Sequence, residues 1–203
     1  QNVSFQLRRG EVLGITGLVG AGRTETVLSL FGLNPPDSGE IYLEGKKVLP
    51  RSPAEAKKLG IAFVPESRQT EGLVMQQDAE GNLTLPILSS FANRFGIIDF
   101  RRRRTRAQEM IRQLGVRPPY THMQALKFSG GNQQKIVVAK WLATSPKVLI
   151  VDEPTNGIDV GAKSEIHKLL RDLADSGMAV IMVSSELPEI FSISDRILVM
   201  RRG

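Results

Sequence analysis

Two adjacent carboxylates end an apolar run in the second half of the chain. The run is Val148–Val151, and Asp152 and Glu153 follow it directly. Successive side chains of a strand point in opposite directions, so the two carboxylates can do different chemistry. We predict that Asp152 holds Mg²⁺, directly or through a water molecule, and that Glu153 activates a water molecule for attack on a γ-phosphate. The simpler alternative is that both cap a helix or turn at the strand end.

A glycine-rich segment lies between an apolar run and a helical pattern near the N-terminus. Backbone N–H groups of such a loop turn inward around a phosphate, and the start of the next helix adds partial positive charge. The pattern G-x-x-x-x-G-K-[ST] is matched except at the lysine, where Arg23 stands, and Thr24 supplies a hydroxyl for Mg²⁺. An ordinary glycine-rich turn is the alternative. The predicted nucleotide-binding residues are Gly17, Leu18, Val19, Gly20, Ala21, Gly22, Arg23, Thr24 and Glu25.

A serine followed by two glycines begins a third segment of interest, Ser129-Gly130-Gly131, at the predicted start of a helix. Taken alone, Ser129 is a good helix N-cap. A helix N-terminus that begins with glycines leaves its backbone N–H groups accessible, so it is also a second candidate site for an anion. It precedes the acidic strand end by about twenty residues. Asp159, in the turn after that strand, is equally well interpreted as the N-cap of the next helix.

These residues need a scaffold of alternating strands and helices. Five apolar runs are predicted as buried strands: Val12–Ile15, Ile61–Val64, Val148–Val151, Val180–Val183 and Ile197–Met200. Helical spacing follows Arg23, Gly130 and Asp159, which predicts an α/β fold with a mainly parallel sheet. The strand signal is absent between Ser67 and Leu126. We therefore predict a single domain over residues 1–203, with a core at about 1–66 and 145–203 and a helical subdomain at about 67–144.

The composition is that of a folded globular domain and excludes several classes of protein. Of 203 residues, 41% are hydrophobic and 24% are charged, and no apolar stretch is long enough for a membrane helix or a signal peptide. The absence of cysteine excludes disulfides and thiolate chemistry. The net charge of +6 admits an anionic partner, but the arginine run Arg101–Arg104 has no interleaved aromatic residues and fits a solvated helix face.

The order of these motifs resembles that of ATP-binding cassette (ABC) ATPases. A phosphate loop is followed by Phe128-Ser-Gly-Gly-Asn-Gln and then by Val151-Asp-Glu-Pro-Thr. The wider match covers the whole chain and resembles the second cassette of tandem ATPase subunits from bacterial monosaccharide importers. It implies a P-loop NTPase (RecA-like) core with an inserted helical subdomain, and ATP and Mg²⁺ as ligands. The signature residues implied to contact a partner cassette's ATP are Ser129, Gly130, Gly131, Asn132 and Gln133, and the implied D-loop residue is Asp159.

Three positions depart from the family pattern. The resemblance places Glu66 at the Q-loop glutamine, where it is assigned to Mg²⁺, and Ser185 at the catalytic switch histidine. Arg23 replaces the lysine of the phosphate loop. A planar guanidinium cannot sit between β- and γ-phosphates as a compact ammonium does, and serine lacks the imidazole. We therefore expect a weakly hydrolysing pocket of its own and a signature region that completes the site of a preceding cassette or of a homodimer mate.

The resemblance also implies the surroundings of the chain. The expected partners are transmembrane permease subunits and, indirectly, a periplasmic sugar-binding protein, with no nucleic acid. The expected location is the cytoplasmic face of the bacterial inner membrane. The adenine-stacking aromatic residue of the family lies further upstream than Phe5, so we expect a fragment of a longer subunit with weakened adenine binding. A non-hydrolysing regulatory half and a soluble nucleic-acid- or ribosome-associated ABC protein are the alternatives.

Overall fold

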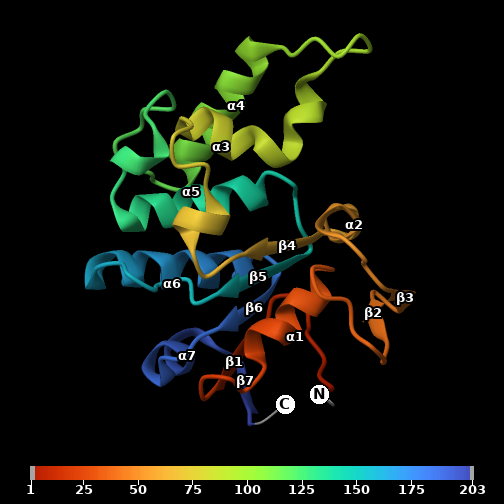
Figure 1. The fold of residues 1–203 in the computed structure, drawn as a ribbon. Helices are drawn as coiled ribbons and strands as arrows, with labels where there is room; N and C mark the ends of the chain where they lie inside the picture. The colour runs from red at the N-terminus through yellow and green to blue at the C-terminus, as the bar shows by residue number, and fades with distance from the viewer. Residues whose placement is uncertain (1–2, 202–203) are drawn as a thin grey trace. The chain divides into compact units, whose positions relative to one another are not determined.

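The computed structural model describes residues 3–201, which divide into two compact units (Figure 1). The first unit comprises residues up to 63, 146–153 and from 170 onward, and the second comprises 64–145 and 154–169. The second unit thus includes residues 154–169, which the sequence analysis assigned to the core. The domain boundaries proposed above stay a prediction.

The first unit contains a five-stranded sheet in the order β4-β5-β6-β1-β7. Its pairs β5–β6, β6–β1 and β1–β7 are parallel, with Val12 opposite Val180 and Asp152 opposite Val183. All five predicted runs lie in these strands, but the expectation of a buried strand is wrong for Ile197–Met200, where only Met200 is buried and Val199 is 71% exposed. The strands are β1 (Val12–Gly17), β4 (Ile61–Val64, whose last residue begins the second unit), β5 (Val148–Asp152), β6 (Ala179–Val183) and β7 (Arg196–Met200). Parallel pairing brings the carboxyl ends of β1, β5 and β6 to one edge of the sheet.

Buried aliphatic side chains of β1, β5 and β6 form the core of this unit. Leu13, Ile15, Leu149, Ile150 and Ile181 are almost fully inaccessible. Strands buried on both faces read as continuous apolar runs rather than as alternating ones, which is why the sequence signal was clear. The helices of this unit are α1 (Arg23–Leu30), α2 (Pro53–Leu59) and α7 (Leu187–Ile193), and α6 (Val160–Asp175) begins in the second unit and ends in the first.

A short antiparallel hairpin of β2 (Ile41–Leu43) and β3 (Lys46–Val48) was not predicted. Each strand has three residues, and most of their side chains are partly or fully exposed, so neither periodicity nor a buried run marks them. The tight turn between them places Glu44 and Gly45 at φ values of +52° and +76°. Two successive residues with positive φ are typical of the two-residue turns that connect the strands of a β-hairpin.

The second unit is helical, as the loss of strand signal after Ser67 indicated. Helices α3 and α5 pack on one another and on α4, and Leu83, Ile111 and Ile136 are fully buried there. Asp99 begins α4 by accepting a hydrogen bond from the Arg102 N–H at 2.9 Å, as N-cap residues do. The elements are η1 (Arg68–Gly72, a π-helix), α3 (Ala79–Thr84), η2 (Leu85–Phe91), α4 (Phe100–Gln113), η3 (Ala125–Lys127) and α5 (Gly130–Leu142).

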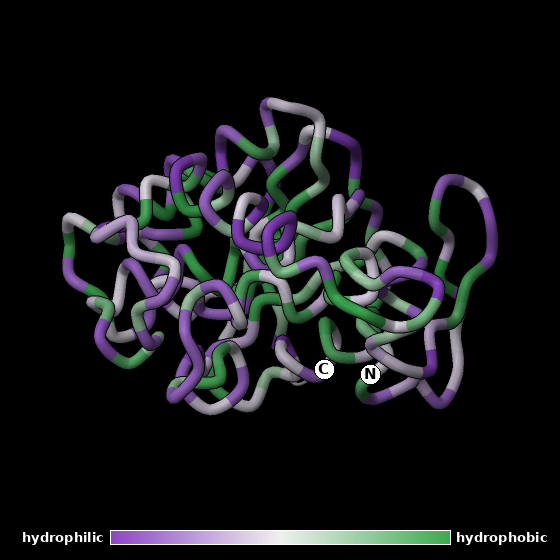
Figure 2. The backbone as a smooth tube through the Cα atoms, turned by 90° about the horizontal axis from the view of Figure 1, so that it is seen from above, coloured by the Kyte–Doolittle hydropathy of each residue, from purple (hydrophilic) through white to green (hydrophobic). Residues whose placement is uncertain are grey.

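None of the helices among residues 3–201 has the length and apolar character needed to cross a bilayer. Hydrophobic and hydrophilic stretches instead alternate along the backbone (Figure 2).

Candidate functional site

The glycine-rich loop connects the end of β1 to the start of α1, as predicted. Gly17 ends the strand in close contact with the end of β7, because a Cβ at this position would lie 2.3 Å from the Met200 carbonyl oxygen. Gly20 and Gly22 have φ values of +78° and +89°, which only glycine adopts readily. Between them and the strand, Leu18 and Val19 are 80% and 94% exposed. Their exposure places the backbone of this loop at the surface, in front of a helix N-terminus.

Arg23, the substituted residue of the loop, faces Glu153. Its Nη1 lies 3.3 Å from Glu153 Oε1, and the two side chains are only 11% and 14% exposed. The residues are 130 positions apart in the sequence, and the parallel sheet brings them together at its carboxyl edge. An ion pair this shielded from water is screened less than a surface pair.

Ser185 completes the set of donors to Glu153. The Ser185 N–H donates to Oε1 at 2.8 Å and its hydroxyl donates to Oε2 at 3.2 Å. Glu153 has a φ of +44° and donates its own N–H to the Val183 carbonyl oxygen at 2.9 Å. A left-handed glutamate costs about 1–3 kcal/mol and persists only where its surroundings hold it. The structure thus brings Arg23, Glu153 and Ser185 into one cluster.

The two oxygen ligands predicted for Mg²⁺ in this unit are of the right chemical kind. Asp152 is 1% exposed at the end of β5, and Thr24 lies in the first turn of α1. Carboxylate and hydroxyl oxygens suit Mg²⁺, which proteins usually hold with one or two carboxylates together with phosphate oxygens and water. Among residues 3–201, no group of three or more His, Cys, Asp or Glu side chains could hold a metal ion by itself. This donor set therefore fits a cation that arrives with a nucleotide.

Glu66 lies in the second unit, in the segment between β4 and η1. Its Oε1 accepts a hydrogen bond from Asn156 Nδ2 at 3.2 Å. Asn156 belongs to the turn that precedes Asp159, so this carboxylate is engaged with the predicted D-loop. A role of Glu66 toward Mg²⁺ stays a prediction.

The predicted signature residues lie at the start of α5. Ser129 is the N-cap residue, but its side chain makes no cap hydrogen bond within the described residues and instead accepts one from Asn132 Nδ2 at 2.8 Å. Gln133 is buried and donates to the carbonyl oxygens of Ala125 and Phe128 at 3.2 and 3.0 Å. Asn132 and Gln133 therefore stabilise the entry to the helix, while the Ser129 hydroxyl is not used to cap it.

Both glycines of the predicted signature lie in close contact with neighbouring segments, and the contact at Gly131 leaves no room for a side chain. A Cβ at Gly131 would lie 2.5 Å from the Ala162 Cβ of α6, and one at Gly130 would lie 2.9 Å from Arg68 Nη2. Asp159 accepts a hydrogen bond from the Ala162 N–H at 2.9 Å, so it does cap α6. The start of α5 and the turn before α6 are thus adjacent in this unit.

Sequence reasoning missed the role of Arg68. Nothing in its residue type or its spacing from other motifs indicated a partner. It donates to the carbonyl oxygens of Asn156 and Gly157 at 2.7 and 3.0 Å, and partial burial lowers the pKa of its guanidinium. Lys140 was missed as well. Burial lowers the pKa of Lys140, and its ammonium donates to the Gly72 carbonyl oxygen at 2.7 Å.

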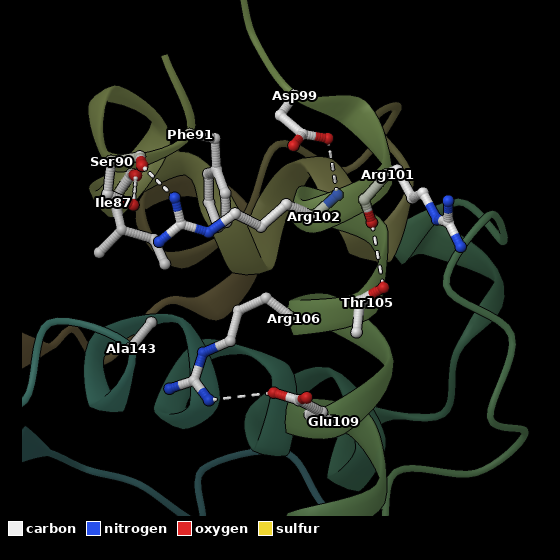
Figure 3. A pocket seen from close by; sticks show the side chains of 10 residues that line it. All are labelled: Ile87, Ser90, Phe91, Asp99, Arg101, Arg102, Thr105, Arg106, Glu109 and Ala143. Carbon is white, nitrogen blue, oxygen red and sulfur yellow. Dashed lines mark hydrogen bonds and ion pairs between the residues drawn. The ribbon is translucent and has the colours of Figure 1, made fainter. Parts of the chain in front are cut away.

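An open pocket of about 730 Å³ lies on the second unit beside α4 and η2, and no predicted site residue lines it (Figure 3). Arg102 extends across Phe91 toward the Ser90 carbonyl oxygen, and Arg106 pairs with Glu109. Elsewhere in the arginine run, Arg103 and Arg104 pair with Glu80 of α3. Most arginines of the run therefore form contacts within the unit, and they also make its surface basic.

Comparison with known proteins decides the family. The family model described as ABC transporter matches residues 1–156. The chain belongs to the ABC transporter family. The resemblance inferred from the motifs is therefore confirmed. The α/β fold class is confirmed as well, because the structure of a post-hydrolysis state of the ATP-binding cassette MJ0796 bound to ADP and Pi superimposes with a TM-score of 0.83. That match has 25% identity and covers 100% of this chain and 86% of that one.

Several curated relatives of this cassette are similar along its whole length. The ribose import ATP-binding protein RbsA of Bacillus licheniformis is 49% identical over 203 residues, which are 100% of this chain and 41% of that protein. The xylose import ATP-binding protein XylG of Thermoanaerobacter pseudethanolicus is 50% identical over 203 residues, 100% of this chain and 40% of that protein. The cassette thus spans about two fifths of the length of these relatives.

Proposed function

We propose that this chain is the second cassette of a tandem ATP-binding subunit that powers monosaccharide import. In this proposal its own pocket binds ATP and hydrolyses it weakly, while its signature region completes a more competent site on the preceding cassette. The names of the relatives, which are import ATP-binding proteins for ribose and xylose, support the transport role. The share of those proteins that the chain covers is compatible with one half of such a subunit.

The observation that carries the weak pocket is the contact of Arg23 with Glu153. A carboxylate offers about four lone-pair positions, and three of those of Glu153 are used by Arg23 Nη1, the Ser185 N–H and the Ser185 hydroxyl. Little capacity remains for an attacking water. The guanidinium that would meet the phosphates is the same one that pairs with this carboxylate. Nucleotide phosphate and Glu153 therefore compete for one cation.

The remaining residues of the pocket retain the chemistry of nucleotide binding. The loop from Gly17 to Gly22, which is exposed at residues 18–20, would offer backbone N–H groups to phosphate oxygens, and the N-terminus of α1 favours negative charge there. Thr24 and Asp152 would hold Mg²⁺ in this unit, and the role of Glu66 toward the cation stays an expectation from the family resemblance. The cation would neutralise charge on the β- and γ-phosphates. Binding is therefore expected to persist where hydrolysis is weak.

The helical unit is the part that we expect to meet the membrane subunits. Its exposed apolar side chains Phe95, Ile97 and Phe100 lie in and next to the loop that precedes α4. Exposed apolar residues rimmed by charge are typical of protein contact sites. A cytoplasmic segment of the permease is the proposed occupant, which places the chain at the cytoplasmic face of the bacterial inner membrane. A periplasmic sugar-binding protein would act on it only through the permease.

A non-hydrolysing regulatory half is the second candidate, and the Arg23–Glu153 contact favours it too. The two functions differ in whether Glu153 matters. A weak hydrolase loses its residual turnover when Glu153 becomes glutamine, whereas a nucleotide sensor binds ATP with no turnover to lose.

The proposed function is tested by Mg²⁺-dependent ATP turnover of this chain over a wide range of protein concentration. We expect ATP binding with near-zero turnover at every concentration, because the competent site requires the preceding cassette. Turnover that rises faster than linearly with concentration would mean that the chain pairs with itself and that Arg23, Glu66 and Ser185 suffice for hydrolysis. That result would contradict the asymmetric proposal.

A further inference from the structure

One arginine of the second unit joins three segments that are far apart in the sequence. Arg68 is the first residue of η1, directly after Ser67, whose side chain accepts a hydrogen bond from the Thr70 N–H at 3.3 Å. The guanidinium of Arg68 reaches the turn between β5 and α6 and also the first turn of α5. Each of its three nitrogens donates to a different acceptor.

Two of these acceptors are successive backbone carbonyls of the turn before Asp159. Nη1 donates to the Asn156 oxygen at 2.7 Å and Nη2 donates to the Gly157 oxygen at 3.0 Å. Gly157 has a φ of +66°, a conformation that few other residues would accept. The planar fork of a guanidinium fits two oxygens side by side, which a single ammonium cannot match. Asn156 is held a second time, because its side-chain Nδ2 donates to the Glu66 carboxylate at 3.2 Å.

The third acceptor belongs to the signature helix. Arg68 Nε donates to Gln133 Oε1 at 3.3 Å, and the amide nitrogen of Gln133 is fixed by the Ala125 and Phe128 carbonyl oxygens. The guanidinium also lies against Gly130, where a Cβ would approach Nη2 to 2.9 Å. Gly130 at the start of α5 is therefore the residue type that lets the guanidinium come this close.

The electrostatics of Arg68 differ from those of a surface ion pair. Its three acceptors are uncharged oxygens, and burial lowers its pKa. Its positive charge lies at the N-terminus of α5, where the helix dipole is also positive. The charge of Arg68 adds to the positive potential at the N-terminus of α5, which favours an approaching anion. Its three hydrogen bonds meanwhile hold the turn and the start of α5 together.

We propose that Arg68 is a positioning residue that holds the turn before Asp159 and the start of α5 as one surface. The inference rests on the proposed function, in which this surface, with Ser129 and Gly131, is offered to the nucleotide of the preceding cassette. Arg68 touches no reacting atom in this account. It acts by fixing where the Asn156–Asp159 turn and the signature residues lie relative to one another.

The test replaces Arg68 with lysine in the complete ATP-binding subunit, assembled with its membrane subunits. The R68K variant keeps the positive charge and loses the planar guanidinium that donates to two neighbouring oxygens. We expect kcat for ATP to fall about tenfold while KM, the affinity for ADP and the melting temperature stay close to those of the parent. The matched control is R112K, at an exposed arginine of α4. Amide exchange at Ile158 and Asp159 is expected to accelerate in R68K and not in R112K.

Three results would overturn the inference. An R68K subunit with the parent's kcat would show that charge alone suffices. A lowered melting temperature with a proportional loss of ADP binding would mean that Arg68 only maintains the fold. Unchanged amide exchange in the turn would mean that Arg68 does not hold it. If the unmodified assembly fails to turn over ATP, the proposed function fails, and the exchange measurement then decides the role of Arg68 separately.

Discussion

Arg23 of the predicted phosphate loop determines the surroundings of Glu153, the carboxylate that we propose as the base. Arg23 and Glu153 are shielded from solvent, and each has the other within 3.3 Å. Arginine spreads its charge over a plane, so it pairs well with a carboxylate, whereas lysine presents a compact charge that fits between phosphates. The chemistry of this pocket is thus decided by which anion the residue at position 23 prefers.

We predict that Arg23→Lys strengthens ADP binding by this chain about tenfold, which corresponds to 1.4 kcal/mol. The affinity rises because the lysine ammonium fits between phosphates. It also does not pair with Glu153 as the guanidinium of Arg23 does. Isothermal titration with ADP measures it without interference from hydrolysis. Arg112→Lys is the control for the same exchange at an exposed site and should leave the affinity unchanged. Equal or weaker ADP binding by R23K would contradict the assignment.

The types of the site residues could be predicted from the sequence, but their contacts could not. Asp152 and Glu153 could be identified because burying carboxylates at the end of an apolar strand costs free energy of desolvation. Such residues are expected only where a partner or a ligand compensates for that cost. The contact of Glu153 with Arg23 depends on which strands are neighbours, and that information is absent from either motif alone. Arg68 could not be identified for the same reason, because two of its acceptors are backbone oxygens almost ninety positions away and the third is the side chain of Gln133.

Three strands of the sheet were predictable because their burial is nearly complete. β1, β5 and β6 appeared as continuous apolar runs because both of their faces are covered. β7 was also found from its apolar run, although most of its side chains are not buried. The hairpin of β2 and β3 was missed because short, half-exposed strands carry no such signal.

Helix α2 shows what local signals specify: Ser52 caps it by accepting from the Glu55 N–H at 3.3 Å, and Gly60 ends it at a φ of +86°.

Asp195 joins three elements of the sheet-containing unit, and its removal is expected to weaken that unit. It accepts from the Val12 N–H and from Arg171 Nη1, both at 2.8 Å. The Val12 hydrogen bond, followed by Arg171, lowers the pKa of Asp195, despite the opposing effect of burial. Asp195→Asn is predicted to lower the free energy of unfolding at neutral pH by about 1 kcal/mol, a value reduced for solvent exposure.

The pH dependence of this loss follows from the direction of the pKa shift. A carboxylate with a lowered folded-state pKa stabilises the protein above its unfolded pKa, and this contribution disappears as the pH falls through the folded pKa. The difference between the parent and D195N should therefore shrink below about pH 4. Urea unfolding at neutral and acidic pH measures both values. A difference that is constant with pH would show that the charge of Asp195 is not what stabilises the fold.

At the scale of the whole chain, the predicted functions are divided between the two units. The phosphate loop, Asp152, Glu153 and Ser185 belong to the sheet-containing unit, whereas Glu66, the signature residues and Asp159 belong to the helical one. The sequence analysis placed residues 145–203, and with them the turn before α6, in the core. This turn contacts Arg68 and lies in the second unit, and the subdomain boundaries stay a prediction.

The central claim is that this cassette serves its partner's site more than its own, and steady-state ATP turnover of the complete assembly tests it directly. Two variants of this cassette are compared: Ser129→Ala removes the signature hydroxyl, and Glu153→Gln removes the base of its own pocket. We predict a loss of at least about tenfold for S129A and of less than about twofold for E153Q. Equal losses in the two variants would contradict the asymmetry.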